Sequence, residues 1–334
     1  MSRYGEAHAN PQGAGDARPT ALQIVKDAEM EGKLKGKAAV ITGVSSGIGT
    51  ETVRAAAATG ATLYLTARNL DKAKTVLADI FKPEQMEFVE MDNSSLESVR
   101  TAAKTILSKT NKVSLLINNA GILAPPELYL SMEGHELQFV TNYLSHFLLF
   151  NLLKPALLAA STPEFQSRVV NVASDEHRHH GIPASDNYSF QKSEYDPWKA
   201  YAQSKTAMVY MANEIESRYG SRGLHAHSVH PGVVGTNLGA YLSAEMHHMI
   251  IHNEKWKPLW KSLEQGAATT VWAAVGTELE GKGGKYLAEC AEAVRGPEGS
   301  PDHMGTFVGH TYKPEDETRL WKNSLELVGL SDDA

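Results

Sequence analysis

The chain has 334 residues, 42% of them apolar, and a formal net charge of −7. This length and composition suit one large α/β domain with extensions, and they indicate neither a disordered protein nor a coiled coil. The acidic balance argues against nucleic-acid binding, because neutralising many phosphates requires dense basic patches. The single cysteine, Cys290, excludes an internal disulfide, and the N-terminus has no apolar run that resembles a signal peptide. We therefore expect a reducing, cytoplasmic compartment.

The first 20 residues are rich in glycine, alanine, proline and polar residues, so we expect an arm that is mobile or lies extended on the body. A short helix is predicted from about Pro19. From Lys37 onward, short apolar runs alternate with helical patterns. Strands are predicted at 38–42, 61–67, 86–91, 113–118, 168–173 and 224–230, and helices up to residue 59 and at 70–80, 95–108, 132–150 and beyond, and 200–218. The alternation predicts a Rossmann-type α/β fold, a doubly wound parallel sheet with helices on both faces and seven strands, one more than the six located by range.

The most apolar stretch runs from Leu144 to Ala160 and contains His146, Lys154 and Pro155. It is too short and too polar for a transmembrane segment, which needs about 20 predominantly apolar residues. We predict a buried helix there and no membrane span.

A glycine-rich turn follows the first predicted strand. Gly43, Gly47 and Gly49 lie between that strand and the next helix, where glycines let the backbone approach a pyrophosphate at the helix N-terminus. An ordinary tight turn is the alternative. The candidate phosphate contacts are Gly43, Ser45, Ser46, Gly47, Ile48 and Gly49.

The second predicted strand ends at Ala67-Arg68-Asn69, without the carboxylate that would hold the ribose 2′-hydroxyl of NAD. An arginine fork pairs well with a 2′-phosphate, so the site is predicted to prefer NADP(H). Lys72 adds positive charge nearby. The alternative is that Arg68 is a solvated residue opening the next helix.

Tyr201 and Lys205 stand four residues apart in a predicted helix and therefore share one face. A phenol titrates near pH ~10, so it needs an adjacent cation to exchange protons near neutral pH. This spacing alone also suits an ordinary surface pair, but here the pair occurs in the same sequence as the upstream glycine turn. Together they indicate a nucleotide-dependent oxidoreductase.

The order of these and other motifs resembles the short-chain dehydrogenases and reductases from about Lys35 to Leu287, in the branch of retinol dehydrogenases and WW-domain oxidoreductases, although no WW domain is present. Besides the turn, the matching segments are Asp92 after the third strand, Asn118-Asn-Ala-Gly121 after the fourth, Asn142 within a helix, Ser174 after the fifth, Tyr201 with Lys205, and His230-Pro-Gly-Val-Val-Gly-Thr236.

The resemblance implies a role for each matching residue. Tyr201 is the acid that protonates a carbonyl oxygen, Lys205 lowers its pKa and holds the nicotinamide ribose, and Ser174 hydrogen-bonds the substrate oxygen. Asn142 positions a water in the proton relay, with a buried asparagine at a helix distortion as the alternative. The remaining implied cofactor contacts are Asp92, which also reads as a helix N-cap, Asn93, Asn119, Ala120, Gly121, Pro231, Gly232, Val234 and Thr236.

The chain is predicted to divide into an N-terminal arm with a short helix (1–34), a catalytic domain (35–290) with a substrate lid at about 237–262, and a C-terminal extension with a terminal helix (291–334). The segment 175–198 is expected to line the pocket, and the lid, rich in Met, Tyr and Trp, is expected to admit bulky apolar substrates. Ordinary packing of the lid is the alternative. Relatives commonly dimerise through the helices that contain 144–160 and 200–218, so a homodimer is an option, and the C-terminal helix covers either that surface or the pocket.

Histidines cluster in two places, His177, His179 and His180 in the segment after Ser174 and His247, His248 and His252 in the lid. No ordered spacing with acidic or sulfur partners accompanies them, so we expect solvated or pocket-lining histidines and no metal.

The leading hypothesis is an NADP(H)-dependent enzyme that interconverts a ketone or aldehyde and an alcohol on a lipophilic small molecule such as a retinoid, a steroid or a polyketide-derived metabolite. Two alternatives stay open: a catalytically silent NADP(H)-binding scaffold or redox sensor, and an NADP(H)-dependent enzyme that reduces a carbon–carbon double bond.

Overall fold

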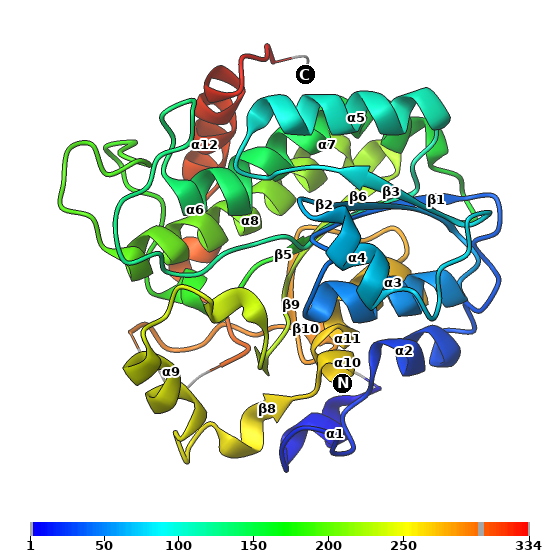
Figure 1. Ribbon diagram of the computed structural model, residues 1–334, viewed down its shortest axis with the longest axis horizontal. Coiled ribbons are helices and arrows are strands. Elements are labelled where there is room, and N and C mark those ends of the chain that lie inside the picture. Colours follow the sequence, from blue (N-terminus) through cyan, green and yellow to red (C-terminus); the bar gives the residue numbers. More distant parts are fainter. Residues whose placement is uncertain (1–2, 300–303, 333–334) are drawn as a thin grey trace.

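The computed structural model describes residues 3–299 and 304–332. Its centre is a twisted sheet with helices on both faces (Figure 1). The main-sheet strands are β1 (Ala38–Thr42), β2 (Thr62–Ala67), β3 (Met86–Glu90), β4 (Leu115–Asn118), β5 (Ser167–Val172), β6 (Leu224–His230), β9 (Lys285–Ala288) and β10 (Ala291–Glu292), and a second, two-stranded sheet pairs β7 (Val233–Val234) with β8 (Trp260–Lys261).

The strand order β10-β9-β6-β5-β4-β1-β2-β3 confirms the doubly wound topology. Seven strands pair in parallel, as predicted, and the two-residue β10 adds an antiparallel edge. The order reverses between β1 and β4, and ligands of such sheets bind at the carboxyl ends of the strands beside that point.

Twelve α-helices are described in these residues, with one π-helical turn and several 3₁₀ turns. The α-helices are α1 (Gly5–Ala9), α2 (Ala21–Asp27), α3 (Ile48–Ala58), α4 (Leu70–Val76), α5 (Leu96–Lys109), α6 (Leu137–Phe139), α7 (Ser145–Ala160), α8 (Pro197–Tyr219), α9 (Ala244–Ile251), α10 (Leu263–Gly266), α11 (Ala268–Val275) and α12 (Pro314–Leu327). The π-helical turn is η1 (Val140–Leu144), and the 3₁₀ turns are η2 (Asp175–Arg178), η3 (Gly220–Arg222), η4 (Asn237–Gly239), η5 (Lys257–Leu259), η6 (Thr277–Leu279) and η7 (Gly309–Thr311).

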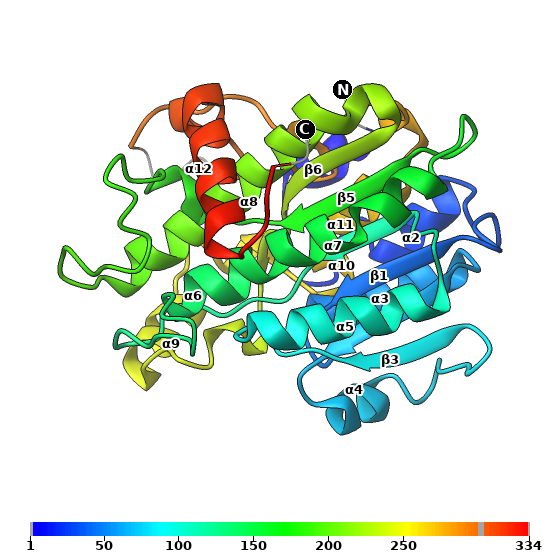
Figure 2. The same cartoon turned by 90° about the horizontal axis from the view of Figure 1, so that it is seen from above.

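The sheet separates two apolar cores, because successive side chains of a strand point to opposite faces. In β1, Val40 packs into the core formed with α5, α7, α8 and α12, and Ile41 packs into the core formed with α2, α3 and α11. Both side chains are fully buried. Figure 2 shows α5, α7 and α12 together on one side of the sheet. Burial on both faces explains why the strands read as continuous apolar runs.

The helix that carries Tyr201 begins earlier than the sequence pattern predicted. Asp196 caps α8 by accepting hydrogen bonds from the backbone N–H groups of Trp198 and Lys199, at 2.9 Å each, and Pro197 occupies the first turn. Proline is favoured there because its missing N–H has no helical partner. This start places Tyr201 in the second turn of the helix.

Among the described residues, one helical run, Leu137–Ala160, is long and apolar enough to cross a membrane, and 72% of its apolar window is buried inside the protein. The run is longer than the stretch considered in the sequence because α6 and η1 extend α7. Its burial is that of a core helix: Phe147 and Phe150 pack edge-on against Trp321 of α12. The terminal helix thus covers α7 and α8, and it does not line the pocket.

The N-terminal arm lies on the body at the base of the lid. The guanidinium of Arg18 donates hydrogen bonds to the carbonyl oxygens of Leu259 (3.1 Å) and Trp260 (2.6 Å), and its side chain is nearly inaccessible. Gln265 donates to the carbonyl oxygen of Asp16 at 3.1 Å. The arm and the lid therefore form one packed unit.

Candidate active site

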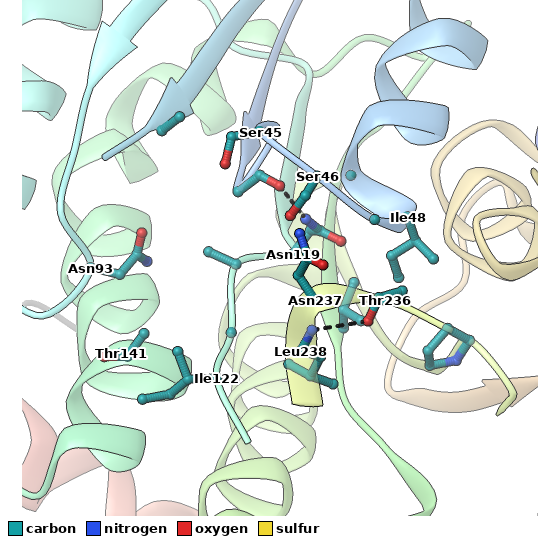
Figure 3. A pocket seen from close by; sticks show the side chains of 18 of the residues that line it. Ser45, Ser46, Ile48, Asn93, Asn119, Ile122, Thr141, Thr236, Asn237 and Leu238 are labelled. Atoms are coloured by element: carbon teal, nitrogen blue, oxygen red, sulfur yellow. Dashed lines mark hydrogen bonds between the residues drawn. The ribbon is translucent and has the colours of Figure 1, made fainter. Parts of the chain in front are cut away.

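A cavity of about 510 Å³ opens at the carboxyl ends of β1, β4 and β5. The structure brings the predicted cofactor contacts and three of the four predicted catalytic residues, Ser174, Tyr201 and Lys205, around it, and Asn142 lies behind its wall. Figure 3 shows one side formed by Asn93, Thr141 and Ile122, and the facing side formed by the glycine turn and the start of the lid.

The glycine turn packs tightly against the loop after β4. A Cβ atom on Gly43, where φ is +73°, would lie 2.7 Å from the Cα of Ala120, and one on Gly49 would lie 2.3 Å from the carbonyl oxygen of Gly43. Real Cβ atoms do not approach this closely, so larger residues would displace the turn. These two glycines are needed for the packing of the turn itself, in addition to leaving room for a ligand.

Asn119 ties the turn to β4. Its amide Nδ2 donates to the carbonyl oxygen of Thr42 at 2.8 Å, and its backbone N–H donates to the Thr42 hydroxyl at 2.9 Å. Its Oδ1 is buried without a hydrogen-bond partner in the described structure, as is Oγ1 of Thr141. Both residues line the cavity. Buried acceptors rarely stay unpaired, so this wall fits a ligand that brings hydrogen-bond donors.

Positive charge marks one end of the cavity, where Arg68 and Lys72 are exposed to solvent. Nearby, Oδ1 of Asp92 accepts hydrogen bonds from the backbone and hydroxyl of Ser94, at 2.9 and 2.7 Å. Asp92 thus braces its own turn while lining the cavity, and Ser95 is the residue that caps α5. Asn93 donates to the hydroxyl of Ser145 at 2.8 Å and so joins this turn to α7.

Ser174, Tyr201 and Lys205 meet beside the end of β5. The Ser174 hydroxyl accepts a hydrogen bond from the backbone N–H of Glu176 at 3.2 Å, which leaves its own proton available for donation. Tyr201 and Ser174 are within hydrogen-bonding reach through their side chains. The Lys205 ammonium donates to the carbonyl oxygen of Val172 at 2.9 Å and lies 5.5 Å from the ring centre of Tyr201.

Burial sets the electrostatics of this group. Desolvation raises the pKa of Tyr201 well above its ordinary value, the hydrogen bond with Ser174 opposes that rise, and the charge of Glu176 adds to it. Burial also lowers the pKa of Lys205 to about 8. Desolvation is the largest influence on the pKa of Tyr201 in this structure, and the expectation that Lys205 lowers this pKa stays a prediction. At neutral pH, Tyr201 is a neutral phenol that can donate a proton.

Asn142 lies in η1, where the helix widens to a π-helical turn. Its Oδ1 accepts from the backbone N–H of Ile122 at 2.9 Å, and its Nδ2 donates to the Ile122 carbonyl at 3.1 Å and to the Ser204 hydroxyl at 2.9 Å. The side chain thus fixes the loop after β4 relative to α8. Asn142 is therefore a buried asparagine at a helix distortion, and its role in a proton relay stays a prediction.

Two expectations about the pocket wall are wrong. No residue that lines this cavity belongs to 175–198; that segment packs on α8 and α12 instead, where the Tyr188 carbonyl accepts from Gln203 at 2.9 Å and Asp186 pairs with Arg319 at 2.6 Å. His177 is neither solvated nor pocket-lining but fully buried. Within residues 3–299 and 304–332, no group of three or more His, Cys, Asp or Glu side chains is arranged to hold a metal.

Sequence reasoning missed several wall residues, namely Met91, Ile122, Thr141, Val172, Ala173, His230, Asn237 and Leu238. Most of them directly adjoin predicted residues in the sequence, so adjacency at strand ends was an available signal. Thr141 also adjoins a predicted residue, Asn142, but neighbouring residues of a helix point in different directions, so only the orientation of the helix brings Thr141 to the wall.

Comparisons with known proteins agree with this arrangement. The family model for short chain dehydrogenases matches residues 37–247. The short-chain dehydrogenase/reductase prx1 of Penicillium roqueforti is 49% identical over 330 residues, covering 99% of this chain and 96% of that protein. Retinol dehydrogenase 13 of Mus musculus is 32% identical over 306 residues, covering 89% and 85%.

Solved structures give the same fold. An uncharacterized protein from Mycobacterium paratuberculosis matches with a TM-score of 0.68 at 29% identity, covering 91% of this chain and 97% of that one. The complex of Pseudomonas aeruginosa RhlG with NADP matches with a TM-score of 0.61 at 20% identity, covering 76% and 95%. The chain belongs to the short-chain dehydrogenase family of oxidoreductases. The similarity to retinol dehydrogenase 13 confirms the resemblance to that branch.

Proposed function

We propose that this protein is an NADP(H)-dependent oxidoreductase that interconverts a ketone or aldehyde and an alcohol on a medium-sized lipophilic molecule. The observation that carries this proposal is the meeting of Ser174, Tyr201 and Lys205 at one wall of a cavity whose other end carries Arg68 and Lys72. One end suits proton transfer to a carbonyl oxygen, and the other suits a phosphate-bearing cofactor.

The chain fits NADP(H) on its own residues. Arg68 and Lys72 supply the positive charge that a 2′-phosphate requires, and the N-terminus of α3 at Ile48 supplies backbone donors for a pyrophosphate. The unpaired oxygen of Asn119 accepts from ligand hydroxyls. When bound, the cofactor supplies or accepts the hydride. RhlG, which was solved in complex with NADP, shares only the fold with this chain, at 20% identity.

The protein supplies the proton and the polar contacts. Tyr201, neutral because burial raises its pKa, donates its phenolic proton to the carbonyl oxygen as the carbon is reduced. Ser174 donates a hydrogen bond to the same oxygen and stabilises the charge that develops there. Lys205 stabilises the resulting phenolate through its ammonium. In the reverse direction, the phenolate accepts the proton of the alcohol.

Apolar residues favour a lipophilic substrate. Ile122 and Leu238 line the cavity (Figure 3). The predicted lid also carries three exposed apolar side chains outside the cavity wall, Tyr241, Met249 and Ile251. Retinoid-, steroid- or polyketide-like carbonyl compounds of secondary metabolism suit such a wall. We place the reaction in the cytoplasm.

The test is oxidation of NADPH and of NADH by the purified chain over a panel of lipophilic ketones, aldehydes and enones. We expect NADPH-selective reduction of carbonyl compounds that is lost in Tyr201→Phe. Tyr219→Phe is the matched control, since Tyr219 is also a buried tyrosine of α8 but lies at the far end of the helix. Tight NADPH binding without turnover would favour the scaffold hypothesis. Reduction of enones alone would favour an enzyme that reduces a carbon–carbon double bond.

A further inference from the structure

The backbone at Ser174 is held by two histidines, His177 of η2 and His230 at the end of β6. The carbonyl oxygen of Ser174 accepts a hydrogen bond from Nδ1 of His177 at 2.7 Å. The backbone N–H of Asp175 donates to Nδ1 of His230 at 3.2 Å. The carbonyl and the N–H of the single peptide group that joins Ser174 to Asp175 are thus each fixed by an imidazole ring.

The Asp175 carboxylate binds the C-terminal extension. Its oxygens accept from the backbone N–H of Gly305 at 3.0 and 2.8 Å and from the Tyr286 hydroxyl at 3.1 Å, and Nε2 of His230 lies 3.5 Å away. Three donors converge on one carboxylate that is 15% exposed. Such charge-assisted bonds are about twice as strong as neutral ones.

His177 contacts the C-terminal extension at a second place, through Thr311 and His310. Its Nε2 lies 3.1 Å from the hydroxyl of Thr311, and its carbonyl oxygen lies 2.6 Å from Nε2 of His310. His177 and Thr311 are fully buried. Burial lowers the pKa of His177 to about 3, so the ring stays neutral: Nδ1 donates to Ser174, and Nε2 accepts from Thr311.

We propose that Asp175 and His177 are positioning residues for Ser174, and that the C-terminal segment 305–311 sets the direction of the serine hydroxyl through them. The segment lies outside residues 37–247, which the family model matches. The inference rests on the proposed function, because Ser174 acts on the substrate oxygen there. It gives the C-terminal extension a role in the chemistry in addition to its packing.

The test is a double-mutant cycle between positions 175 and 174 with an accepted carbonyl substrate. We expect Asp175→Ala to lower kcat about 10- to 100-fold, because a misdirected hydroxyl loses much of its stabilising hydrogen bond. The dissociation constant for NADPH should change less than about twofold, since Ser174 contacts the substrate. In a Ser174→Ala background, Asp175→Ala should have no further effect on kcat.

Two more variants separate positioning from folding. Thr311→Val removes only the hydroxyl that faces His177 and should lower kcat in the same direction. Ser324→Ala is the matched control in the same extension: it removes a buried 2.7 Å hydrogen bond to Tyr143 and should leave kcat unchanged. An unchanged kcat in folded Asp175→Ala, or an equal loss with and without Ser174, would overturn the proposal.

A readout without turnover keeps the two proposals distinguishable. If the wild-type chain reduces no carbonyl compound, the proposed function fails. Hydrogen exchange of the amides in 174–178 then tests the positioning by itself. Faster exchange there in Asp175→Ala and Thr311→Val, but not in Ser324→Ala, supports the contact between the two segments as the restraint, and unchanged exchange refutes it.

Discussion

At the scale of single residues, Arg68 decides the proposed cofactor preference. It is exposed at the cavity end, and no carboxylate stands beside it in the sequence Ala67-Arg68-Asn69. We expect Arg68→Ala to raise the KM for NADPH about 10- to 100-fold, the equivalent of one or two charge-assisted hydrogen bonds. The KM for NADH should stay within about twofold.

Steady-state kinetics with both cofactors measure this preference. Lys74→Ala is the control, because Lys74 is an exposed lysine of α4, the helix that follows Arg68, and does not line the cavity. An equal loss with NADPH and NADH would contradict a role for Arg68 at the 2′-phosphate.

The residues around the cavity divide into those that the sequence predicts and those that it does not. Ser174 and Tyr201 lie in motifs whose spacing carries their chemistry. His177 carries no such signal, because its partners Ser174 and Thr311 are 3 and 134 positions away and only the fold joins them. The raised pKa of Tyr201 could not be predicted either, since the sequence shows the neighbouring lysine but not the burial that raises this pKa.

At the scale of elements, the lid depends on the N-terminal arm. Arg18 holds the carbonyl oxygens at the end of the lid, next to β8. We expect Arg18→Ala to raise the KM for substrate about tenfold and to leave kcat nearly unchanged, because the lid end loses several charge-assisted bonds far from Tyr201.

Limited proteolysis is the second measurement for this variant: cleavage within 237–259 should become faster. Arg3→Ala is the control, since Arg3 donates to the carbonyl of Asp27 at 2.6 Å on the same arm but not to the lid. If both variants behave like the wild type, the arm does not brace the lid.

Elements were predictable wherever their signals are local. The strand 38–42 and the strand 224–230 match the predicted bounds, because short apolar runs bounded by turns define them. The π-helical turn at Asn142 was not predicted as an element, because it depends on bonds to Ile122 and Ser204. The two-residue β10 was not predicted either, because it carries no periodic signal and depends on its pairing with β9.

At the scale of the whole molecule, α12 covers α7 and α8, the helices that the sequence analysis considered as a dimer surface. Trp321 is 2% exposed and packs on Phe147 and Phe150, with the Arg218 guanidinium 4.8 Å from its ring centre. We expect a monomer in light scattering. Trp321→Ala should reduce the free energy of unfolding by about 3–5 kcal/mol and promote self-association. A stable wild-type dimer would show that another face associates.

Buried titratable groups predict how stability depends on pH. Burial lowers the pKa of His146 to about 4 and of His177 and His227 to about 3, against 6.5 when unfolded. Below pH 6.5 the unfolded chain therefore binds more protons than the folded chain at these sites, so the free energy of unfolding decreases as the pH decreases. Burial raises the pKa of Glu136 from 4.5 to about 7, and the folded chain binds the extra proton between these values. The contribution of Glu136 to the pH dependence of stability therefore cancels that of one histidine.

These four groups together contribute the slope of about two histidines. Each fully titrating group contributes about 1.4 kcal/mol per pH unit, so their joint contribution to the free energy of unfolding should fall by up to about 3 kcal/mol between about pH 6 and 5. Urea unfolding at several pH values measures it. His227→Leu should reduce the slope by about 1.4 kcal/mol per pH unit, because one buried neutral imidazole is removed from β6. A flat profile would mean that these imidazoles are hydrated in the folded protein and titrate near their ordinary value.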